Sequence, residues 1–570
     1  MTDQTDYAGM ANRTLGGQRT PVEERVLLAL VALKIMVFCA LAVNTRFVMD
    51  EFWHFAQANY FGHGFFETIF PEKAVGYAAF FKVSHWIGWD AVSKLLAGRL
   101  LTVLITLGLL WLVYAMAQRQ GHGRLAAAAS VLLLLSFSTF MERAFRLRSE
   151  PLAIAFAAAA LWVCLRGSDR WRSLLLAGIL SGMAFVTTQK AVYFNVALGV
   201  ALVTTALMVR APGVAMRRGA LLLGGWALAV AGYALSLGGF APWPVLRALV
   251  LGPLDVALNG GRYYPDIGLF VTQTLTRNAL AYALCAIGLI LTLRAFPRLV
   301  DAARVHTVFT VIVTALIFSH DQPWPYVFTM ALPFMASYGV FALTRLATLP
   351  RGMVVATVLG AAILLPSLAR NLAYIGHDNR AQLSVLRTAE ALMPSGAGYF
   401  DGIGMVPTRD MAPRVWLDAR GIDETLYAGA DSLVAQTFQT APPEVVIETY
   451  RLTKLDPLLG PILSESYLRV ADNILMQGAL ILPGETRSFQ VLRARAFVVV
   501  ARGTTGPACA QVMIDGLWRE LPPSLDRGHY LMRSCDDAGN PVWLIPAEQA
   551  GRLPISTPER RSLFVGIYQY

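Results

Sequence analysis

Residues 25–55 read RVLLALVALKIMVFCALAVNTRFVMDEFWHF, and this stretch decides the kind of fold to expect. A long apolar run ends at two adjacent carboxylates, Asp50 and Glu51, which precede the aromatic stretch 52–55. A helix of about 20 apolar residues crosses the ~30 Å hydrocarbon layer of a membrane. The sequence therefore predicts a membrane span that ends in an acidic pair at the membrane surface.

The composition extends this interpretation to most of the chain. Of 570 residues, 56% are hydrophobic and only 15% are charged, which excludes an ordinary soluble globular protein. We expect a polytopic α-helical membrane protein with about eleven spans in residues 25–372, after a polar cytoplasmic tail at 1–24. The predicted span cores are 27–45, 100–117, 125–141, 151–165, 173–187, 191–209, 219–238, 279–293, 305–319, 327–343 and 353–369.

Arginine placement predicts the orientation. With a cytoplasmic N-terminus, every inner loop is basic, as the positive-inside bias requires. The arginines concerned are 119, 124, 166, 170, 172, 210, 217, 218, 294, 298, 304, 345 and 351. An odd number of spans places the residues after Asn371 outside, so we expect an inner-membrane protein with a periplasmic or otherwise extracytoplasmic C-terminal part. The net charge of +11 is then largely topological and does not indicate nucleic-acid binding.

Residues 72–88 could be taken for a further span. Lys73, Lys82 and His85 argue against it, because an ion in the membrane interior costs a few kcal/mol. We expect interfacial helices over 50–95, with Trp86 and Trp89 at headgroup level.

The last 200 residues have shorter apolar runs of strand length, separated by turn signals. We expect an α/β unit at 373–484 and a β-rich unit at 485–570. A disulfide between Cys509 and Cys535, both in the β-rich unit, would persist in an oxidising compartment. No Cys/His spacing resembles a zinc site.

The acidic pair has two interpretations. Carboxylates at a helix start can simply cap the helix that follows. The functional alternative is a general base, or a metal ligand, held at the membrane surface. Two carboxylates are too few ligands to predict a metal, so a divalent ion is possible but its site is unknown.

The segment 142–151, ERAFRLRSEP, places Arg143, Arg146 and Arg148 on the outer side, against the positive-inside bias. These arginines could pair with the glutamates that flank them, Glu142 and Glu150. Alternatively they form a phosphate site, because guanidinium groups bind phosphate oxygens in a bidentate way.

Further polar residues fall in other predicted outer connections. Lys190 follows the fifth span and could bind phosphate or merely reach toward the headgroups. The loop 241–278, which carries Arg262 and Tyr263, could belong to the site or be an interfacial lid. The turn at 320–326, with His320 and Tyr326, could contact substrate or be a structural turn. All these groups lie on one predicted side, which favours a site.

The order of these motifs resembles a known class. An acidic pair closes the first span, interfacial helices follow, and 98–100 (GRL) opens the second span. The Arg-rich junction, Gly178 and Gly182 before Lys190, and 326–333 are similar in placement. Over residues 26–370 the chain resembles the GT-C glycosyltransferases that use polyprenyl-phosphate sugars, above all the protein O-mannosyltransferase and aminoarabinose transferase branches. It differs at 52–54, where such families have small or aliphatic residues.

The resemblance implies a transfer reaction at the outer face of the membrane. A polyprenyl-phosphate sugar would be the donor, and Asp50 would take the proton of an acceptor hydroxyl on a glycan, lipid or protein. Glu51 would orient the acceptor or help to bind a divalent ion. The phosphate would be held by cations, for which Arg143, Arg146, Arg148, Lys190 and Arg262 are the candidates. The substrate candidates are His54, Tyr263, His320 and Tyr326.

Two other classes remain open on the sequence alone. A transporter or flippase of a phosphorylated lipid-linked substrate would want ionisable residues along a path through the membrane, and Lys34 is the main one within a span. A non-catalytic envelope assembly factor would use the part after Asn371 to bind a partner. The sequence does not identify the sugar or the acceptor.

Overall fold

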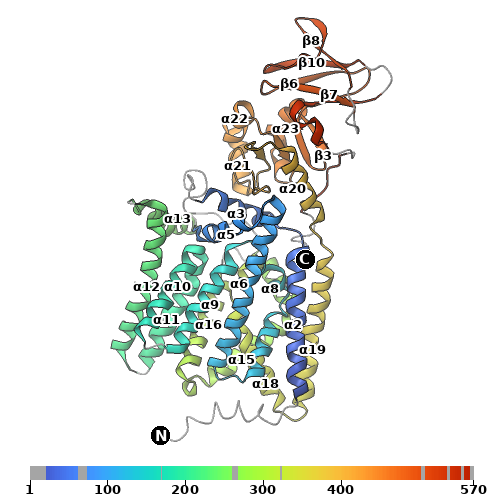
Figure 1. Ribbon diagram of the computed structural model, residues 1–570. Coiled ribbons are helices and arrows are strands. Elements are labelled where there is room, and N and C mark those ends of the chain that lie inside the picture. The colour runs from blue at the N-terminus through green and yellow to red at the C-terminus, as the bar shows by residue number, and fades with distance from the viewer. Residues whose placement is uncertain are drawn as a thin grey trace.

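The computed structural model describes residues 21–61, 74–167, 170–208, 210–239, 241–259, 267–320, 324–501, 508–535, 540–553 and 558–564. Figure 1 shows a bundle of long helices with a mixed helix-and-strand part stacked on one end. We call this end the domain end of the bundle, and the residues from Arg380 onward the C-terminal domain.

Helices account for the bundle. In chain order they are α2 (Pro21–Asn44), α3 (Met49–Tyr60), α5 (Gly76–Ile87), α6 (Ala91–Arg119), α7 (Arg124–Leu134), α8 (Ser138–Arg143), α9 (Ser149–Gly167), α10 (Trp171–Thr187), α11 (Val192–Met208), α12 (Pro212–Gly238), α13 (Trp243–Asn259), α14 (Ile267–Arg277), α15 (Ala279–Arg294), α16 (Asp301–Phe318), α17 (Pro325–Phe328), α18 (Leu332–Ala347) and α19 (Gly352–Ile375). Each of the eleven predicted span cores overlaps a helix of this series.

Seven helices among the described residues are long and apolar enough to cross a membrane on their own: α2, α6, α9, α11 with its preceding turn, α12, α16 and α19. Helices α14 and α15 meet at 88° and together make an eighth candidate. The predicted cores at 125–141, 173–187 and 327–343 correspond to shorter apolar helices, α7, α10 and α18. The chain is a multi-pass membrane protein, and its span count is approximate.

Small residues allow close packing between helices α10 and α12. A Cβ added to Gly178 would lie 2.2 Å from Leu222 O, and one added to Gly182 would lie 2.8 Å from Trp226 O. Helix backbones in a lipid environment associate through such small residues. The two glycines whose placement resembles GT-C enzymes therefore serve helix packing.

Two short helices, α3 and α5, lie at the domain end and run across the ends of the long helices (Figure 1). Each has 12 residues, or about 18 Å at 1.5 Å per residue, which is too short to cross a ~30 Å layer. Helix α6 then begins at the cap residue Asp90, whose side chain accepts a hydrogen bond from Ser93 N at 2.6 Å. Residues 62–73, including Lys73, lie outside the described part of the chain.

The first part of the C-terminal domain combines helices with a small sheet. Its helices are α20 (Arg380–Leu392), α21 (Ala419–Ala428), α22 (Leu433–Thr440) and α23 (Asp456–Ser466). Its strands, in the order β1-β2-β4-β3, are β1 (Tyr399–Phe400), β2 (Val445–Ile447), β4 (Ile474–Gln477) and β3 (Tyr467–Ala471). Strands β1 and β2 run parallel and the other pairs antiparallel.

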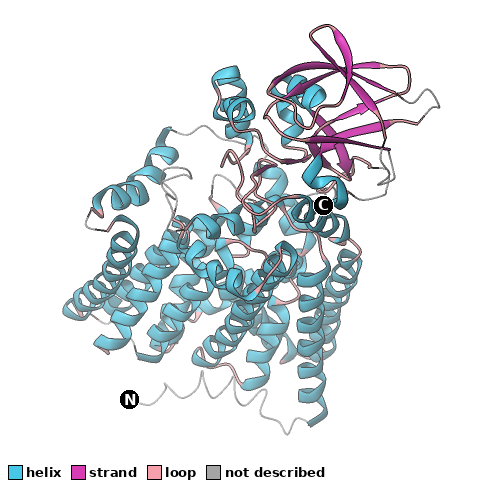
Figure 2. Cartoon of the chain, turned by 45° about the horizontal axis from the view of Figure 1, so that its top comes forward, coloured by secondary structure: helices cyan, strands magenta, loops and turns pink. Residues whose placement is uncertain are grey.

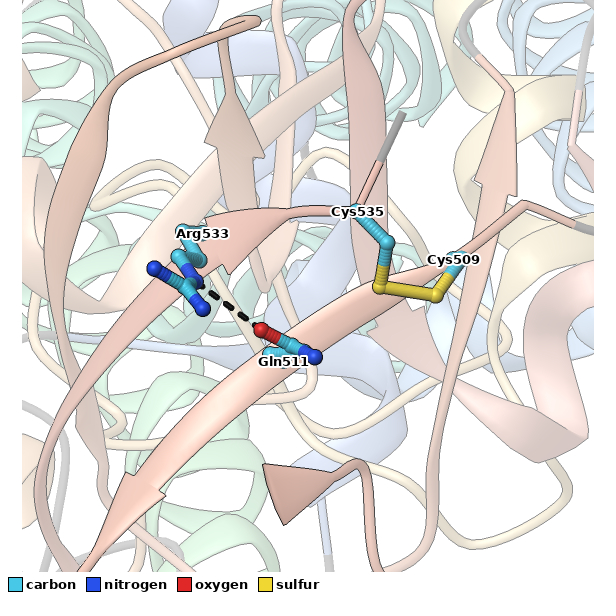
Figure 3. The surroundings of a disulfide bond; sticks show 4 residues. All are labelled: Cys509, Gln511, Arg533 and Cys535. Atoms are coloured by element: carbon cyan, nitrogen blue, oxygen red, sulfur yellow. Dashed lines mark hydrogen bonds between the residues drawn. A yellow bond between two sulfur atoms is a disulfide. The ribbon is translucent and has the colours of Figure 1, made fainter. Parts of the chain in front are cut away.

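The remaining strands form two antiparallel sheets, seen as the strand-rich part of Figure 2. One sheet has the order β6-β10-β8-β9 and the other β5-β11-β7. The strands are β5 (Ala479–Ile481), β6 (Thr486–Val491), β7 (Phe497–Ala501), β8 (Ala510–Ile514), β9 (Leu517–Glu520), β10 (Gly528–Ser534) and β11 (Val542–Pro546). A disulfide joins Cys509 to Cys535 at the ends of β8 and β10, as predicted (Figure 3).

The C-terminal domain packs directly on α3. The Trp53 ring stacks on that of Trp416 with centroids 4.9 Å apart. A Cβ added to Gly404, whose φ is +79°, would lie 2.7 Å from the Ala56 Cβ, so only glycine allows this approach. One continuous core includes buried side chains of α3, α5, α6 and the domain. The helix that carries the acidic pair is therefore held between the bundle and the domain.

Candidate active site at the domain end of the bundle

The two adjacent carboxylates lie in different surroundings. The Glu51 side chain is fully buried, whereas 21% of the Asp50 side chain is exposed. Consecutive residues on a helix point about 100° apart, so neighbours in sequence reach different partners. The acidic pair is thus two separate groups with separate roles.

Glu51 is the centre of a buried charge cluster. Its two carboxylate oxygens accept hydrogen bonds from Arg99 Nε at 2.9 Å and Arg99 Nη2 at 2.8 Å, and Arg146 Nη1 donates at 2.7 Å. Burial by itself would raise the Glu51 pKa, but the charges of Arg99 and Arg146 lower it to about 2. Glu51 also accepts a bond from Val48 N at 2.9 Å, so it caps α3, the structural role considered above.

Arg99 ties this cluster to the end of α2. Its Nη1 donates to Ala42 O at 2.9 Å and Thr45 O at 2.7 Å, and its guanidinium lies 3.5 Å from the centroid of the Phe47 ring. Gly98, beside it, allows α6 to approach α3, since a Cβ there would lie 2.7 Å from the Phe55 ring. The GRL motif therefore positions α3.

Asp50 begins a chain of alternating charges. Its Oδ2 accepts a hydrogen bond from Arg148 Nη1, Arg148 Nε donates to Glu150 Oε2 at 3.1 Å, and Lys190 Nζ donates to Glu150 Oε1 at 2.9 Å. We call Asp50, Arg148, Glu150 and Lys190 the ion-pair chain. Burial would raise the Asp50 pKa, but Arg148 holds it below its ordinary value. Asp50 is therefore a carboxylate at neutral pH and can accept a proton.

Tyr326 brings the two cations of the ion-pair chain together. Its ring centroid lies 3.6 Å from Arg148 Cζ and 4.6 Å from Lys190 Nζ. The negative face of an aromatic ring attracts cations and leaves their N–H groups able to donate elsewhere. The side chains of Lys190 and Asp50 are 29% and 21% exposed, whereas those of Arg148 and Glu150 are 6% and 3% exposed. A cation and a carboxylate therefore face the accessible side together.

His54 lies on the same helix face as Asp50. Its Nδ1 is 2.6 Å from Asp50 O, and its ring centroid is 4.9 Å from that of Tyr77, whose hydroxyl donates to Gln57. Burial and the nearby Arg148 lower the His54 pKa to about 4, so the ring is neutral near pH 7. With Nδ1 donating to a carbonyl, Nε2 is the nitrogen left to accept a hydrogen bond.

The other predicted site residues lie in different surroundings. Arg146 is fully buried between Glu51, Arg46 O at 2.5 Å and the Tyr374 hydroxyl at 3.0 Å. Arg143 is 4% exposed at the end of α8. His320 Nδ1 lies 2.8 Å from the Tyr193 hydroxyl. Arg262 and Tyr263 lie outside the described residues.

The sequence interpretation missed functional candidates that the fold brings together. Glu150 was considered only as a neutralising partner, yet it binds both Arg148 and Lys190. Tyr77, from the short helix α5, packs on His54. The sequence does contain a signal for Glu150, because this carboxylate stands two residues after Arg148 at the start of a predicted span. Within the described residues, no group of three His, Cys, Asp or Glu side chains gathers to hold a metal ion.

The bundle with its short helices, acidic pair and capping domain has the GT-C glycosyltransferase fold, which confirms the resemblance seen in the sequence. A family model described as dolichyl-phosphate-mannose-protein mannosyltransferase matches residues 77–230. A second one, a domain of unknown function (DUF7056), matches residues 423–476. No curated protein matches the chain.

Among solved structures, ArnT from Cupriavidus metallidurans bound to undecaprenyl phosphate is 15% identical, with a TM-score of 0.53, covering 79% of this chain and 97% of ArnT. ArnT in the apo state is 13% identical, with a TM-score of 0.54, covering 80% and 98%. The Archaeoglobus fulgidus oligosaccharyltransferase in the apo form is 12% identical, with a TM-score of 0.50, covering 94% and 78%. At these identities the similarity establishes the fold.

Proposed function

We propose that this protein is a membrane glycosyltransferase that moves a sugar from a polyprenyl-phosphate donor to an acceptor hydroxyl at the domain end of the bundle. The observation that carries the proposal is the ion-pair chain, in which one tyrosine ring contacts both cations, and one of them, Lys190, faces the accessible side together with the carboxylate of Asp50. The match to the mannosyltransferase family model and the shared fold with ArnT, which was solved with undecaprenyl phosphate, support it.

In this reaction Asp50 accepts the proton of the acceptor hydroxyl. The hydroxyl oxygen forms a bond to the anomeric carbon while the bond from that carbon to the phosphate oxygen breaks, most simply with inversion. The departing phosphate needs little help from an acid, because its oxygens already have low pKa values, but its growing charge needs cations. Arg148 and Lys190 supply them, and the neutral His54 and Tyr77 border the acceptor side.

The buried cluster changes the roles proposed for two residues. Glu51 and Arg146 bind one another with almost no exposure, so neither can contact substrate without breaking the pair. We propose that both position α3, and that Arg148 and Lys190 are the main phosphate ligands. Arg143 and the loop with Arg262 and Tyr263 remain further candidates.

A direct test of the proposed function is turnover in vitro. The full chain in nanodiscs is mixed with a lipid and glycan extract of its native membranes, which supplies donor and acceptor. We expect polyprenyl-phosphate sugars to be converted to polyprenyl phosphate, measured by mass spectrometry. Conversion at the rate of protein-free nanodiscs would contradict the proposal.

The transporter alternative finds less support. Lys34, its main intramembrane ionisable residue, is 1% exposed and donates to Ser367 Oγ at 3.0 Å and Asn371 Oδ1 at 2.7 Å. These bonds join α2 to α19. A charge held in a helix contact of this kind does not mark a path for a substrate.

Replacing Arg148 by lysine tests its phosphate role. If Arg148 binds a lipid phosphate bidentately, lysine keeps the charge but not the planar fork. We expect the affinity for polyprenyl phosphate in nanodiscs to fall about tenfold, or ~1.4 kcal/mol, with nearly unchanged thermal stability. The matched control is Arg277→Lys, whose arginine pairs with Glu142 at 3.2 Å outside the ion-pair chain. Equal affinity in Arg148→Lys and the parent would contradict the role.

The orientation is a proposal of its own, based on the basic inner loops. We expect the C-terminal domain to lie outside the cytoplasm, where the disulfide between Cys509 and Cys535 would be maintained. A reporter that is active only outside, fused after Tyr570, should be active. An active inside-only reporter at the same position would contradict this orientation.

A further inference from the structure

The ion-pair chain uses Arg148 in a way that conflicts with phosphate binding. Its Nε is bound to Glu150 at 3.1 Å and its Nη1 to Asp50, so both edges of the guanidinium meet a carboxylate. The four side chains carry two negative and two positive charges. A phosphodiester therefore adds a negative charge that the two cations cannot balance while both remain bound to carboxylates.

Of the two carboxylates, Asp50 is the one that a phosphate can displace from Arg148. Glu150 is 3% exposed and binds both Arg148 and Lys190, whereas Asp50 is 21% exposed and its side chain bonds to Arg148. Breaking the contact that is nearer to solvent leaves a carboxylate that water can reach, and so costs less than releasing a fully buried one. Tyr326 holds the Arg148 guanidinium in place during this exchange.

Resting on the proposed function, we infer that the donor phosphate displaces Asp50 from Arg148 and thereby releases the base that the reaction needs. Glu150 is the positioning residue of this exchange, because it keeps Arg148 and Lys190 side by side for the phosphate. Asp50 bound to Arg148 is a poor base, since the cation stabilises its ionised form. Because the donor phosphate releases Asp50, the donor binds first and the acceptor hydroxyl is deprotonated only afterwards.

Replacing Asp50 is expected to strengthen the binding of undecaprenyl phosphate. If Asp50 competes with the phosphate for Arg148, then Asp50→Asn removes the competitor. Undecaprenyl phosphate should bind to this variant about tenfold more tightly than to the parent protein, the size of effect typical for residues in one charge network. Glu150→Gln should not tighten binding, because it removes the residue that keeps the two cations side by side for the phosphate. Loss of structure would weaken binding, so tightening distinguishes competition from damage.

The experiment is a double-mutant cycle with the full chain in nanodiscs and undecaprenyl phosphate as the probe. The variants are Asp50→Asn, Arg148→Gln and the two combined, with Glu142→Gln as a control that removes a buried charge elsewhere at the same end. We expect Asp50→Asn to tighten binding in the parent but not in the Arg148→Gln background, and the control to leave it unchanged.

Three results would overturn the inference. Unchanged or weaker binding in Asp50→Asn would show that Asp50 does not compete with the phosphate for Arg148. Equal tightening of Asp50→Asn in both backgrounds would show a general charge effect that does not act through Arg148. If undecaprenyl phosphate does not bind to the parent protein at all, the proposed function fails, and the inference with it.

Discussion

Asp50→Asn is expected to lower turnover by about 10²–10⁴, because removing a positioned general base typically costs this much. Asparagine has nearly the shape of aspartate, but its amide cannot take a proton from the acceptor. Donor binding should not decrease and the fold should persist, since the Asp50 side chain is partly exposed. The measurement is conversion of polyprenyl-phosphate sugars in nanodiscs, with thermal unfolding recorded in parallel.

The control for this prediction is Asp90→Asn. Asp90 is an exposed carboxylate that caps α6 at the same end of the bundle, outside the ion-pair chain. Asparagine can keep this cap bond through its amide oxygen, so turnover is expected to stay close to that of the parent protein. Parent-level turnover in Asp50→Asn would show that Asp50 is not the base.

Glu51→Gln is expected to destabilise the protein by about 3–5 kcal/mol, the usual cost of removing one partner of a buried ion pair. Arg99 and Arg146, 1% and 0% exposed, would keep their charges without a counter-charge. The measurement is unfolding by denaturant in detergent micelles. Glu424→Gln is the control, because Glu424 and Arg420 form an exposed pair, and such pairs contribute ~0–1 kcal/mol.

The stabilisation of the fold by the ion pairs of Glu51 depends on pH in a defined direction. The Glu51 pKa is lowered in the folded protein from its ordinary value of 4.5 to about 2. A lowered pKa stabilises the fold at pH values above 4.5, and this stabilisation is lost as pH falls from 4.5 toward 2. Glu51→Gln should lack this part of the acid dependence. A variant as stable as the parent at neutral pH would contradict the structural role of Glu51.

The sequence predicts the general fold well, because apolar span length is a local property. It could not predict where spans break. The core at 125–141 forms two helices, α7 and α8, because the Asn278 amide bonds to backbone groups on both sides of the break, Ser136 O at 3.1 Å and Ser138 N at 3.0 Å. Asn278 itself lies at the bend between α14 and α15. A partner about 140 residues away leaves no local pattern.

The site was predictable in its residue types and less so in its roles. The unusual arginines near 142–151 and the acidic pair point to one region, and the structure brings Asp50 into contact with Arg148. What the sequence could not show is which carboxylate pairs with which cation. Glu51 and Asp50 are neighbours in the chain, yet one binds Arg99 and Arg146 and the other binds Arg148. Helix geometry and burial decide this.

The central claim is tested most directly by mass spectrometry of membrane lipids and surface glycans from cells that have the protein, lack it, or produce only Asp50→Asn. We predict that a polyprenyl-phosphate sugar accumulates in cells without the protein and in cells with the variant, and that one sugar is missing from a surface acceptor in both. Identical lipids and glycans in all three would contradict the account.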